Sequence, residues 1–243
     1  MKEDITKHSE SFKIRASEVD KHGKATLPAL CSLFQEVAGN HARKLNFDIT
    51  QLHEQGLTWV LHRMDIKIER YPNWRETITI ETWPAAGDAL RAYRDYRILD
   101  EENNQIGACL SYWMMINLKT RRPTRMPKEV LDMRLSDIKH VMPIKSDRPR
   151  SFEEADIQKK FVVRKSDLDM NEHVNNARLV ECLMETYDED KAYLIKNIDI
   201  MFMQESLAGD IITSEFSKQS GTNLHQLKNQ DGDTIALAEI STG

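Results

Sequence analysis

The chain has few cysteines, and none lies where a disulfide framework or a metal site would need it. Cys31, Cys109 and Cys182 are far apart in the 243 residues, and each sits in an apolar segment. Buried thiols of this kind are typical of a reducing compartment, whereas small secreted domains carry closely spaced cysteines in even numbers. No two of the three have the spacing of zinc ligands. We therefore expect free thiols, no bound metal and no cofactor.

Long hydrophobic runs and targeting segments are also missing. The longest apolar stretch, at 109–118, is about half the length that a membrane-spanning helix needs. The first ten residues, MKEDITKHSE, are polar and contain neither the apolar core of a signal peptide nor an Arg- and Ser-rich transit peptide. These features predict a cytoplasmic protein that does not insert into membranes.

Positive charge is not in excess. The chain has 34 Lys and Arg against 39 Asp and Glu, a net charge of −5. Affinity for nucleic acid comes from neutralising phosphates with concentrated positive charge, so nucleic acid is not expected as a partner. Two local basic clusters remain: the first is Arg121, Arg122, Arg125 and Lys128, and the second is Lys159, Lys160, Arg164 and Lys165.

What the sequence does contain is an internal repeat. The segment FKIRASEVDKHGKATLPALCSLFQE, from Phe12, aligns without gaps with FVVRKSDLDMNEHVNNARLVECLME, from Phe161, at an offset of 149 residues. A second pair of blocks follows at an offset of 134 residues, in which Asp65 matches Asp199. Two matching blocks in the same order indicate a duplicated unit.

Both copies follow the same order of predicted elements: a short alternating strand, a helix, and then further strands. In the first copy Thr26 is the expected N-cap of a helix that runs to Leu45. In the second copy Asn175 or Asn176 caps a helix that runs to Tyr187. The later strands are expected at 59–69, 77–83, 93–100 and 106–117, and at 198–204, 211–218, 224–228 and 234–240.

A unit with one helix and about four antiparallel strands has no second helix to pack against, so the sheet must wrap around the helix. This is the hotdog architecture. We predict an α+β fold, a tandem double hotdog in which each unit is an antiparallel sheet wrapped around a long helix. The N-terminal hotdog is placed at 1–125, a proline-containing linker at 126–158 and the C-terminal hotdog at 159–243.

Three segments, taken in order, carry a family resemblance: WVLHRMDIKIERYPNWRETITIETWPA, SYWMMINLKTRRPTRMP and DLDMNEHVNNARLVE. Together they resemble the acyl-acyl carrier protein (acyl-ACP) thioesterases of plant plastids and bacteria, over about residues 12–240. The resemblance implies a double hotdog that hydrolyses a fatty acyl thioester to free fatty acid and holo-acyl carrier protein. It also implies that the first hotdog binds the acyl chain and the second is catalytic.

Polar residues at alternate positions before the second helix are the first candidates for catalysis. Asp169, Asn171 and His173 would point to one side if this segment were extended. The first copy has a different polar set at the matching place, DKHGK from Asp20, so a single site in the second copy is expected. The structural alternative is that these residues only turn the chain into the helix, as Asp and Asn often do.

Glu205 and Ser206 complete the candidate site, at the place where the family has a glutamate followed by a cysteine. A Cys-His-Asn nucleophilic mechanism would need a thiolate at Ser206, so direct attack by water is the simpler chemistry. We expect Glu205 and His173 to activate that water. Asn171 would hold the substrate or the water, and Asp169 would orient its neighbours.

Further roles are expected around this site. Backbone N–H groups at 174–176, at the start of the second helix, would stabilise the oxyanion with help from the helix dipole. Either basic cluster could dock the strongly acidic carrier protein, although a charge cluster can also be a solvated surface. The candidates for contact with the acyl chain, each of which could instead be ordinary core, are Leu30, Phe34, Trp59, Val60 and Met64.

Three alternatives to acyl-ACP hydrolysis stay open at this point. The protein could act on acyl-CoA esters, it could be a hotdog hydratase or dehydratase, or it could bind acyl groups without catalysis. The expected partner is an acyl carrier protein that carries a fatty acyl group. Because both hotdogs lie in one chain, we expect either a monomer or a homodimer.

Overall fold

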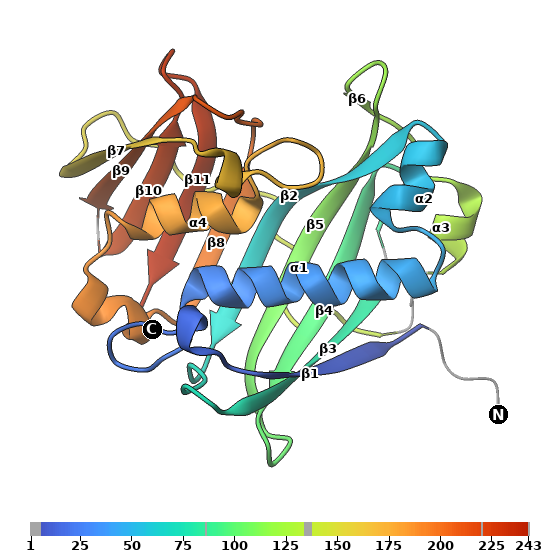
Figure 1. Cartoon of the computed structure of the whole chain (residues 1–243), viewed down its shortest axis with the longest axis horizontal. Coiled ribbons are helices and arrows are strands. Elements are labelled where there is room, and N and C mark those ends of the chain that lie inside the picture. Colours follow the sequence, from blue (N-terminus) through green and yellow to red (C-terminus); the bar gives the residue numbers. More distant parts are fainter. Residues whose placement is uncertain (1–5, 86, 134–137, 220, 243) are drawn as a thin grey trace.

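The computed structural model describes residues 6–85, 87–133, 138–219 and 221–242. Its main elements are one long antiparallel sheet and, on one face of it, the two helices expected from the sequence (Figure 1). Residues 1–5 of the expected N-terminal hotdog and 134–137 of the expected linker lie outside the described residues. The strand order is β1-β3-β4-β5-β2-β8-β11-β10-β9-β7. The predicted tandem double hotdog is therefore the observed architecture.

The first unit holds the longer helix, α1, which spans 18 residues. It begins after Thr26, whose hydroxyl oxygen accepts a hydrogen bond from the Ala29 N–H at 3.3 Å, as expected of an N-cap. The elements of this unit are β1 (His8–Lys13), α1 (Leu27–Lys44), α2 (Ile49–Glu54), β2 (Leu57–Ile68), β3 (Thr77–Ala85), β4 (Arg91–Leu99), β5 (Gln105–Asn117) and β6 (Arg122–Pro123). The short helix α3 (Lys128–Asp132) follows in the expected linker.

The second unit has the shorter helix, α4, of nine residues. Asn175 is its N-cap, and the expected extension to Tyr187 is wrong because the Tyr187 N–H bonds to the Met184 carbonyl, a tighter turn than the α-helix makes. The elements of this unit are β7 (Ile157–Val162), α4 (Asn176–Met184), β8 (Asn197–Phe202), β9 (Ile211–Gln219), β10 (Thr222–Lys228) and β11 (Thr234–Ser241).

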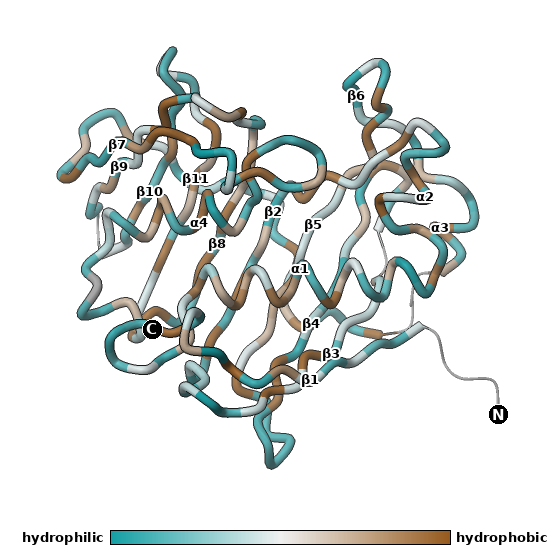
Figure 2. Tube along the Cα trace, in the orientation of Figure 1, coloured by the Kyte–Doolittle hydropathy of each residue, from teal (hydrophilic) through white to brown (hydrophobic). Residues whose placement is uncertain are grey.

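The cores of both units lie between their helix and the sheet. Leu30, Phe34 and Val37 of α1 and Leu179 and Leu183 of α4 belong to one continuous buried cluster with the inner side chains of the strands. Figure 2 shows hydrophobic residues along the strands and hydrophilic ones at the hairpin turns, such as the turn between β4 and β5. Within the described residues, no helix has both the length and the apolarity needed to cross a bilayer.

The two units join where β2 pairs antiparallel with β8, and Asp65 lies directly opposite Asp199 in that pairing. These two residues also match each other in the sequence repeat, so the pair marks the pseudo-twofold relation between the units. Their neighbours Met64, Ile66 and Ile198 point into the core beneath the helices. Since side chains alternate along a strand, the two aspartates face the opposite side of the sheet.

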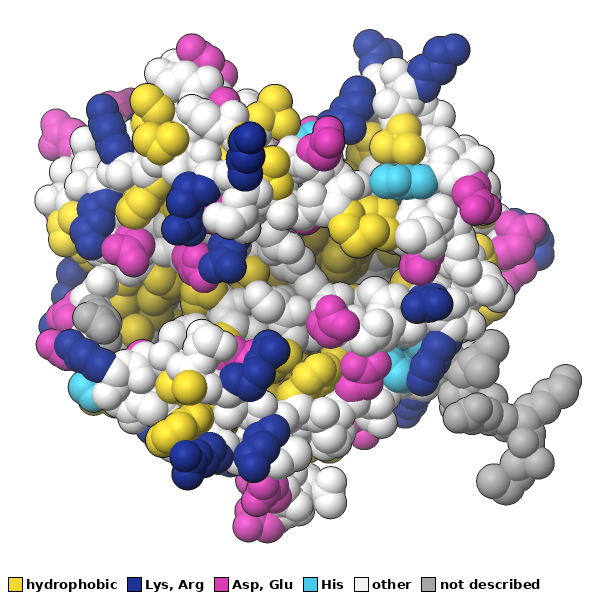
Figure 3. Space-filling view, in the orientation of Figure 1, with side chains coloured by type: hydrophobic (Ala, Val, Ile, Leu, Met, Phe, Trp, Pro, Cys, Tyr) yellow, Lys and Arg dark blue, Asp and Glu magenta, His cyan; other side chains and the backbone are white. Residues whose placement is uncertain are grey.

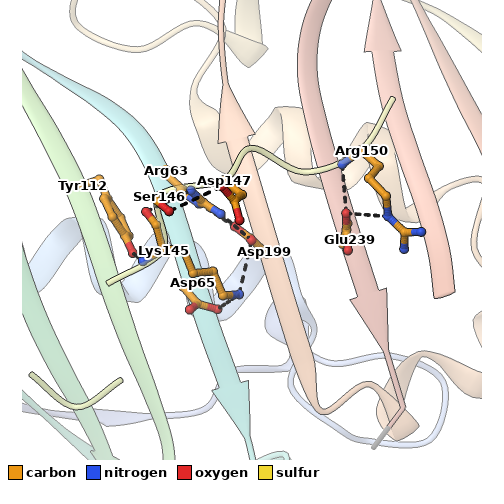
Figure 4. A network of polar contacts seen from close by, with 9 residues as sticks. All are labelled: Arg63, Asp65, Tyr112, Lys145, Ser146, Asp147, Arg150, Asp199 and Glu239. Atoms are coloured by element: carbon orange, nitrogen blue, oxygen red, sulfur yellow. Dashed lines mark hydrogen bonds and ion pairs between the residues drawn. The ribbon is translucent and has the colours of Figure 1, made fainter. Parts of the chain in front are cut away.

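Two cations compensate for this pair of like charges (Figure 4). Nε and Nη2 of Arg63 each donate to the Asp199 carboxylate at 2.7 Å, and the Arg63 side chain is only 3% exposed. Nζ of Lys145, from the expected linker, lies 2.8 Å from Asp65 and 3.2 Å from Asp199. Burial raises the pKa of the Asp65 carboxyl, and the hydrogen bond from Lys145 opposes that shift. The linker therefore helps to hold the two units together.

Replacing Arg63 by Met should lower the free energy of unfolding by about 3–5 kcal/mol, because it leaves Asp199 buried without its bidentate partner. Urea unfolding measures this loss. The double variant Arg63→Met with Asp199→Leu should recover much of it, since the buried charge is then removed as well. Additive losses in the double variant would contradict this account of the joint.

Candidate active site

The turn 168–174 holds three of the predicted site residues, and it is not extended. The Asp169 N–H donates to the His173 carbonyl at 2.8 Å, and a β-bridge closes the turn. At its tip Glu172 takes a left-handed backbone conformation, with φ of 62°. The expectation that period-two alternation aligns Asp169, Asn171 and His173 is therefore wrong. Their positions are set by the hydrogen bonds of the turn.

The same turn occurs in the first unit. Oδ1 of Asp169 accepts from the N–H group two residues later at 2.8 Å, and Oδ1 of Asp20 makes the equivalent bond at 2.9 Å. Gly23, with φ of 70°, occupies the place that corresponds to Glu172. The repeat has thus preserved the backbone, and the two units differ here in their side chains.

The acid and the imidazole expected from the sequence meet in the second unit. Oε2 of Glu205 lies 3.3 Å from Nε2 of His173. Glu205 belongs to the loop after β8, and the Val174 N–H joins this loop to the turn by donating to the Ser206 carbonyl at 2.9 Å. This bond holds His173, in the turn before α4, next to Glu205, in the loop after β8.

In the first unit the matching backbone bond runs from the Ala25 N–H to the Pro72 carbonyl, at 2.8 Å. This correspondence places Tyr71 where the second unit has its glutamate, and Lys24 where it has its histidine. Tyr71 is buried, and Nζ of Lys24 donates to the Asn73 side chain. The first unit has therefore kept the scaffold but carries different chemistry at these positions.

Ser206 is buried, unlike the neighbouring Glu205. The residue is 2% exposed, whereas the Glu205 side chain is 43% exposed and that of His173 is 21% exposed. Among the described residues, no hydrogen bond joins the Ser206 hydroxyl to His173. A serine nucleophile activated by this imidazole is thus not assembled, and the accessible pair is the carboxylate with the imidazole.

Arg121 also reaches the site, and sequence reasoning did not anticipate this. Its Nη2 contacts Oε2 of Glu205, the same oxygen that faces His173. Arg121 lies in the turn between β5 and β6, in the first unit, 84 residues before Glu205. The sequence placed it in a basic cluster, and no local pattern connects it with a glutamate so distant along the chain.

A cavity of about 460 Å³ lies next to the turn 168–174. Figure 3 shows this face hollowed near its middle, with hydrophobic side chains inside. The second unit contributes Asp169, Met170, Asn171 and Asn176. The expected linker contributes Val130 and Met133. The first unit supplies the rest of the wall, mainly from the C-terminal half of α1 and from β2, β4 and β5, including Ala42, Leu45, Phe47, Trp59, Leu61 and Trp113.

Of the expected acyl-chain contacts, Trp59 lines this cavity. Leu30, Phe34 and Met64 are at most 1% exposed and belong to the core, and Val60 is not part of the wall. On α1 the cavity is lined from Gln35 onward, whereas Leu30 and Phe34 lie before that point in the buried core. Met64 lies on β2 and belongs to the same core. Helical periodicity distinguishes an inner face from an outer one, but it does not locate a gap in the packing.

Of the backbone N–H groups at 174–176 that were expected to stabilise the oxyanion, the structure leaves one available. The Val174 N–H donates to Ser206 and the Asn175 N–H to the Asp167 carbonyl, so both are already occupied. Asn176 is the first residue of α4 and lines the cavity, and no described group accepts its N–H. Within the described part of the chain, no cluster of His, Cys, Asp and Glu could hold a metal ion.

Comparison with known proteins places these features in a family. The model of the acyl-ACP thioesterase N-terminal domain matches residues 5–133, and that of the C-terminal domain matches residues 151–242. The chloroplastic oleoyl-acyl carrier protein thioesterase of Coriandrum sativum is 30% identical over 87% of this chain, which spans 63% of that relative's length.

Two solved structures have the same fold. An acyl-ACP thioesterase from Bacteroides thetaiotaomicron superposes with a TM-score of 0.88 at 24% identity, covering 99% of both chains. The 12:0-ACP thioesterase from Umbellularia californica superposes with a TM-score of 0.86 at 24% identity, covering 97% of this chain and 96% of its own. Matched by both domain models in the order of its two hotdogs, this chain belongs to the acyl-ACP thioesterase family.

Proposed function

We propose that the protein hydrolyses fatty acyl-ACP thioesters, releasing a free fatty acid and holo-acyl carrier protein. The observation that carries this proposal is the pair of Glu205 and His173, 3.3 Å apart, beside a turn that lines an apolar cavity. Membership of the acyl-ACP thioesterase family supports the choice of hydrolysis over hydration or dehydration. The cavity has room for an acyl chain, and the acid–imidazole pair can activate water.

In this mechanism the Glu205 carboxylate takes a proton from water as the water oxygen attacks the thioester carbonyl carbon. The carbonyl oxygen becomes an oxyanion, which the N–H of Asn176 at the positive end of α4 would stabilise. When the tetrahedral intermediate collapses, the carbon–sulfur bond breaks and His173 supplies the proton that the thiolate needs.

The other two predicted site residues support this chemistry. Asn171 lines the cavity and offers an amide that can hold the substrate carbonyl or the water. Asp169 fixes the turn, because its Oδ1 accepts the Asn171 N–H. Ser206 contributes its backbone carbonyl to the link between the loop and the turn, a role that needs no hydroxyl.

Replacing Glu205 or His173 by Ala should lower the rate of hydrolysis at least about a hundredfold with little effect on folding, because each removes a proton-transfer group. Ser206→Ala should stay within a few-fold of wild type. Lys24→Ala, at the place in the first unit that matches His173, is the control and should leave the rate unchanged. The water mechanism would be contradicted if an acyl-enzyme intermediate could be trapped in the wild-type protein but not in Ser206→Ala.

We further propose that the first unit, 1–125, binds the acyl chain and the second, 159–243, carries out catalysis. Small residues of α1, among them Ala38, Gly39 and Ala42, leave the cavity open on the helix side. A Cβ at Gly39 would meet no atom within 4 Å, so larger side chains can extend into the space.

Gly39→Leu should shift the preference toward shorter acyl chains, because it fills part of the cavity. Gly39→Ala adds one carbon and should shift it less. Both favour the helix by about 0.5–1 kcal/mol, so folding should not suffer. Values of kcat/KM over a chain-length series of acyl-ACP substrates test this. An unchanged ranking in Gly39→Leu would show that the acyl chain lies elsewhere.

The first basic cluster is the better candidate for docking the carrier protein. Arg121 and Arg122 lie on the turn and strand next to the candidate site, Arg125 follows β6, and Lys128 begins α3. Figure 3 shows basic side chains projecting near β6. Arg122 and Arg125 are exposed, and no described carboxylate lies within ion-pair distance of either. Each cluster has two members paired with carboxylates, Arg121 and Lys128 in the first and Lys159 and Arg164 in the second, so pairing does not distinguish them. The second cluster starts on β7, the last strand of the sheet, whereas Arg121 of the first contacts Glu205.

Reversing Arg122 and Arg125 together to Glu should raise KM for acyl-ACP, and more so at low salt, because exposed charges attract an acidic partner over a Debye length. The same reversal at Lys160 and Lys165 is the matched control. The KM for the same acyl chain on coenzyme A should change little. Equal kinetics in both double variants would remove the docking role, and better hydrolysis of the coenzyme A ester would favour that substrate.

The cellular setting is proposed to be the cytoplasm, with a single chain as the active unit. Cys31 and Cys109 are buried free thiols and Cys182 is a partly buried one, which suits a reducing compartment. Both the cavity and the acid–imidazole pair come from one chain, so a monomer can be active and a homodimer would add no residue to the site described above.

A further inference from the structure

The turn between β5 and β6 carries an arginine from the first unit to the acid of the second. Nη2 of Arg121 and Nε2 of His173 contact the same carboxylate oxygen, Oε2 of Glu205. Arg121 is half exposed, at 48%, so the contact is not forced by packing. Sequence reasoning grouped Arg121 with three other surface cations, yet it is the member of that group that touches Glu205.

The turn itself is built to hold this residue in one place. Oδ1 of Asn117 accepts from the N–H groups of Lys119 and Thr120, at 3.1 and 2.9 Å, and the Arg121 N–H donates to the Asn117 carbonyl at 2.8 Å. Arg121 has a φ of 57°, in the left-handed region where residues with a side chain cost about 1–2 kcal/mol. The backbone alone would therefore favour glycine at this position, so the presence of an arginine must be explained by its side chain.

The contact between Arg121 and Glu205 explains why an arginine is present. Glu205 is exposed and lies in a loop, so its side chain has several rotamers available. Among the described residues its carboxylate has two partners, and both hold Oε2. No described group donates to Oε1, which leaves that oxygen able to accept a proton.

We propose that Arg121 is a positioning residue for hydrolysis, which holds Oε2 of Glu205 beside His173 and leaves Oε1 to take the proton of the attacking water. This inference rests on the proposed function, since it assigns Arg121 a part in that reaction. It also means that the active site is complete only when both units are joined. Arg121 then acts on turnover, in contrast to the docking role of Arg122 and Arg125.

Arg121→Gly separates these two roles, because it removes the guanidinium and relaxes the backbone. Thermal unfolding should show a chain at least as stable as wild type, since glycine accepts a positive φ. Steady-state hydrolysis of one acyl-ACP should show kcat lowered about 10–100-fold and KM changed less than about twofold, the effect of a misplaced catalytic group. Arg121→Lys should recover part of kcat, and Lys119→Ala, in the same turn, should match wild type.

A double-variant cycle provides the decisive readout. In a Glu205→Gln background, Arg121→Gly should cause no further loss, because an effect that acts through the carboxylate cannot appear once the carboxylate is gone. Multiplying losses, or a raised KM with unchanged kcat, would overturn the inference and leave acyl-ACP hydrolysis intact. A wild-type protein that releases no fatty acid from acyl-ACP would instead overturn the proposed function and this inference with it.

Discussion

The pairing of β2 with β8 is the constraint on which the rest of the molecule depends. It makes two half-sheets into one, and it fixes which part of the second unit faces the cavity of the first. The register sets Asp65 against Asp199, a repulsive arrangement that is stable only because Arg63 and Lys145 neutralise it. A slip by one residue would turn every side chain of the joint to the other face, so this register is strongly specified.

Duplication followed by divergence explains how one site arose from two similar units. Both keep an Asx turn closed by a β-bridge, and both tie that turn to a following loop by the same backbone bond. On this common frame the first unit places Lys24 and Tyr71, and the second places His173 and Glu205. The helices have diverged as well, because α1 is twice as long as α4 and its C-terminal half, rich in small residues, walls the cavity.

Local patterns in the sequence were sufficient for most of the fold. Each of the eight later strands was placed within two residues at both ends, because alternating side chains and polar turns are recorded in adjacent residues. The short helices α2 and α3 were missed, since six and five residues give too little periodicity. Asp48 and Gln51 do form a capping box, so that signal for α2 was present in the sequence.

By itself the sequence determined the duplicated unit, the two helices, the strands and the identity of the candidate acid and imidazole. The tertiary structure decided how these meet: Glu205 beside His173, Arg121 on the same carboxylate, and the cavity at the far half of α1. The physical reason is range. Hydrogen-bonded turns and alternation involve neighbours in the chain, whereas a contact across 84 residues depends on the register of strands that no short segment encodes.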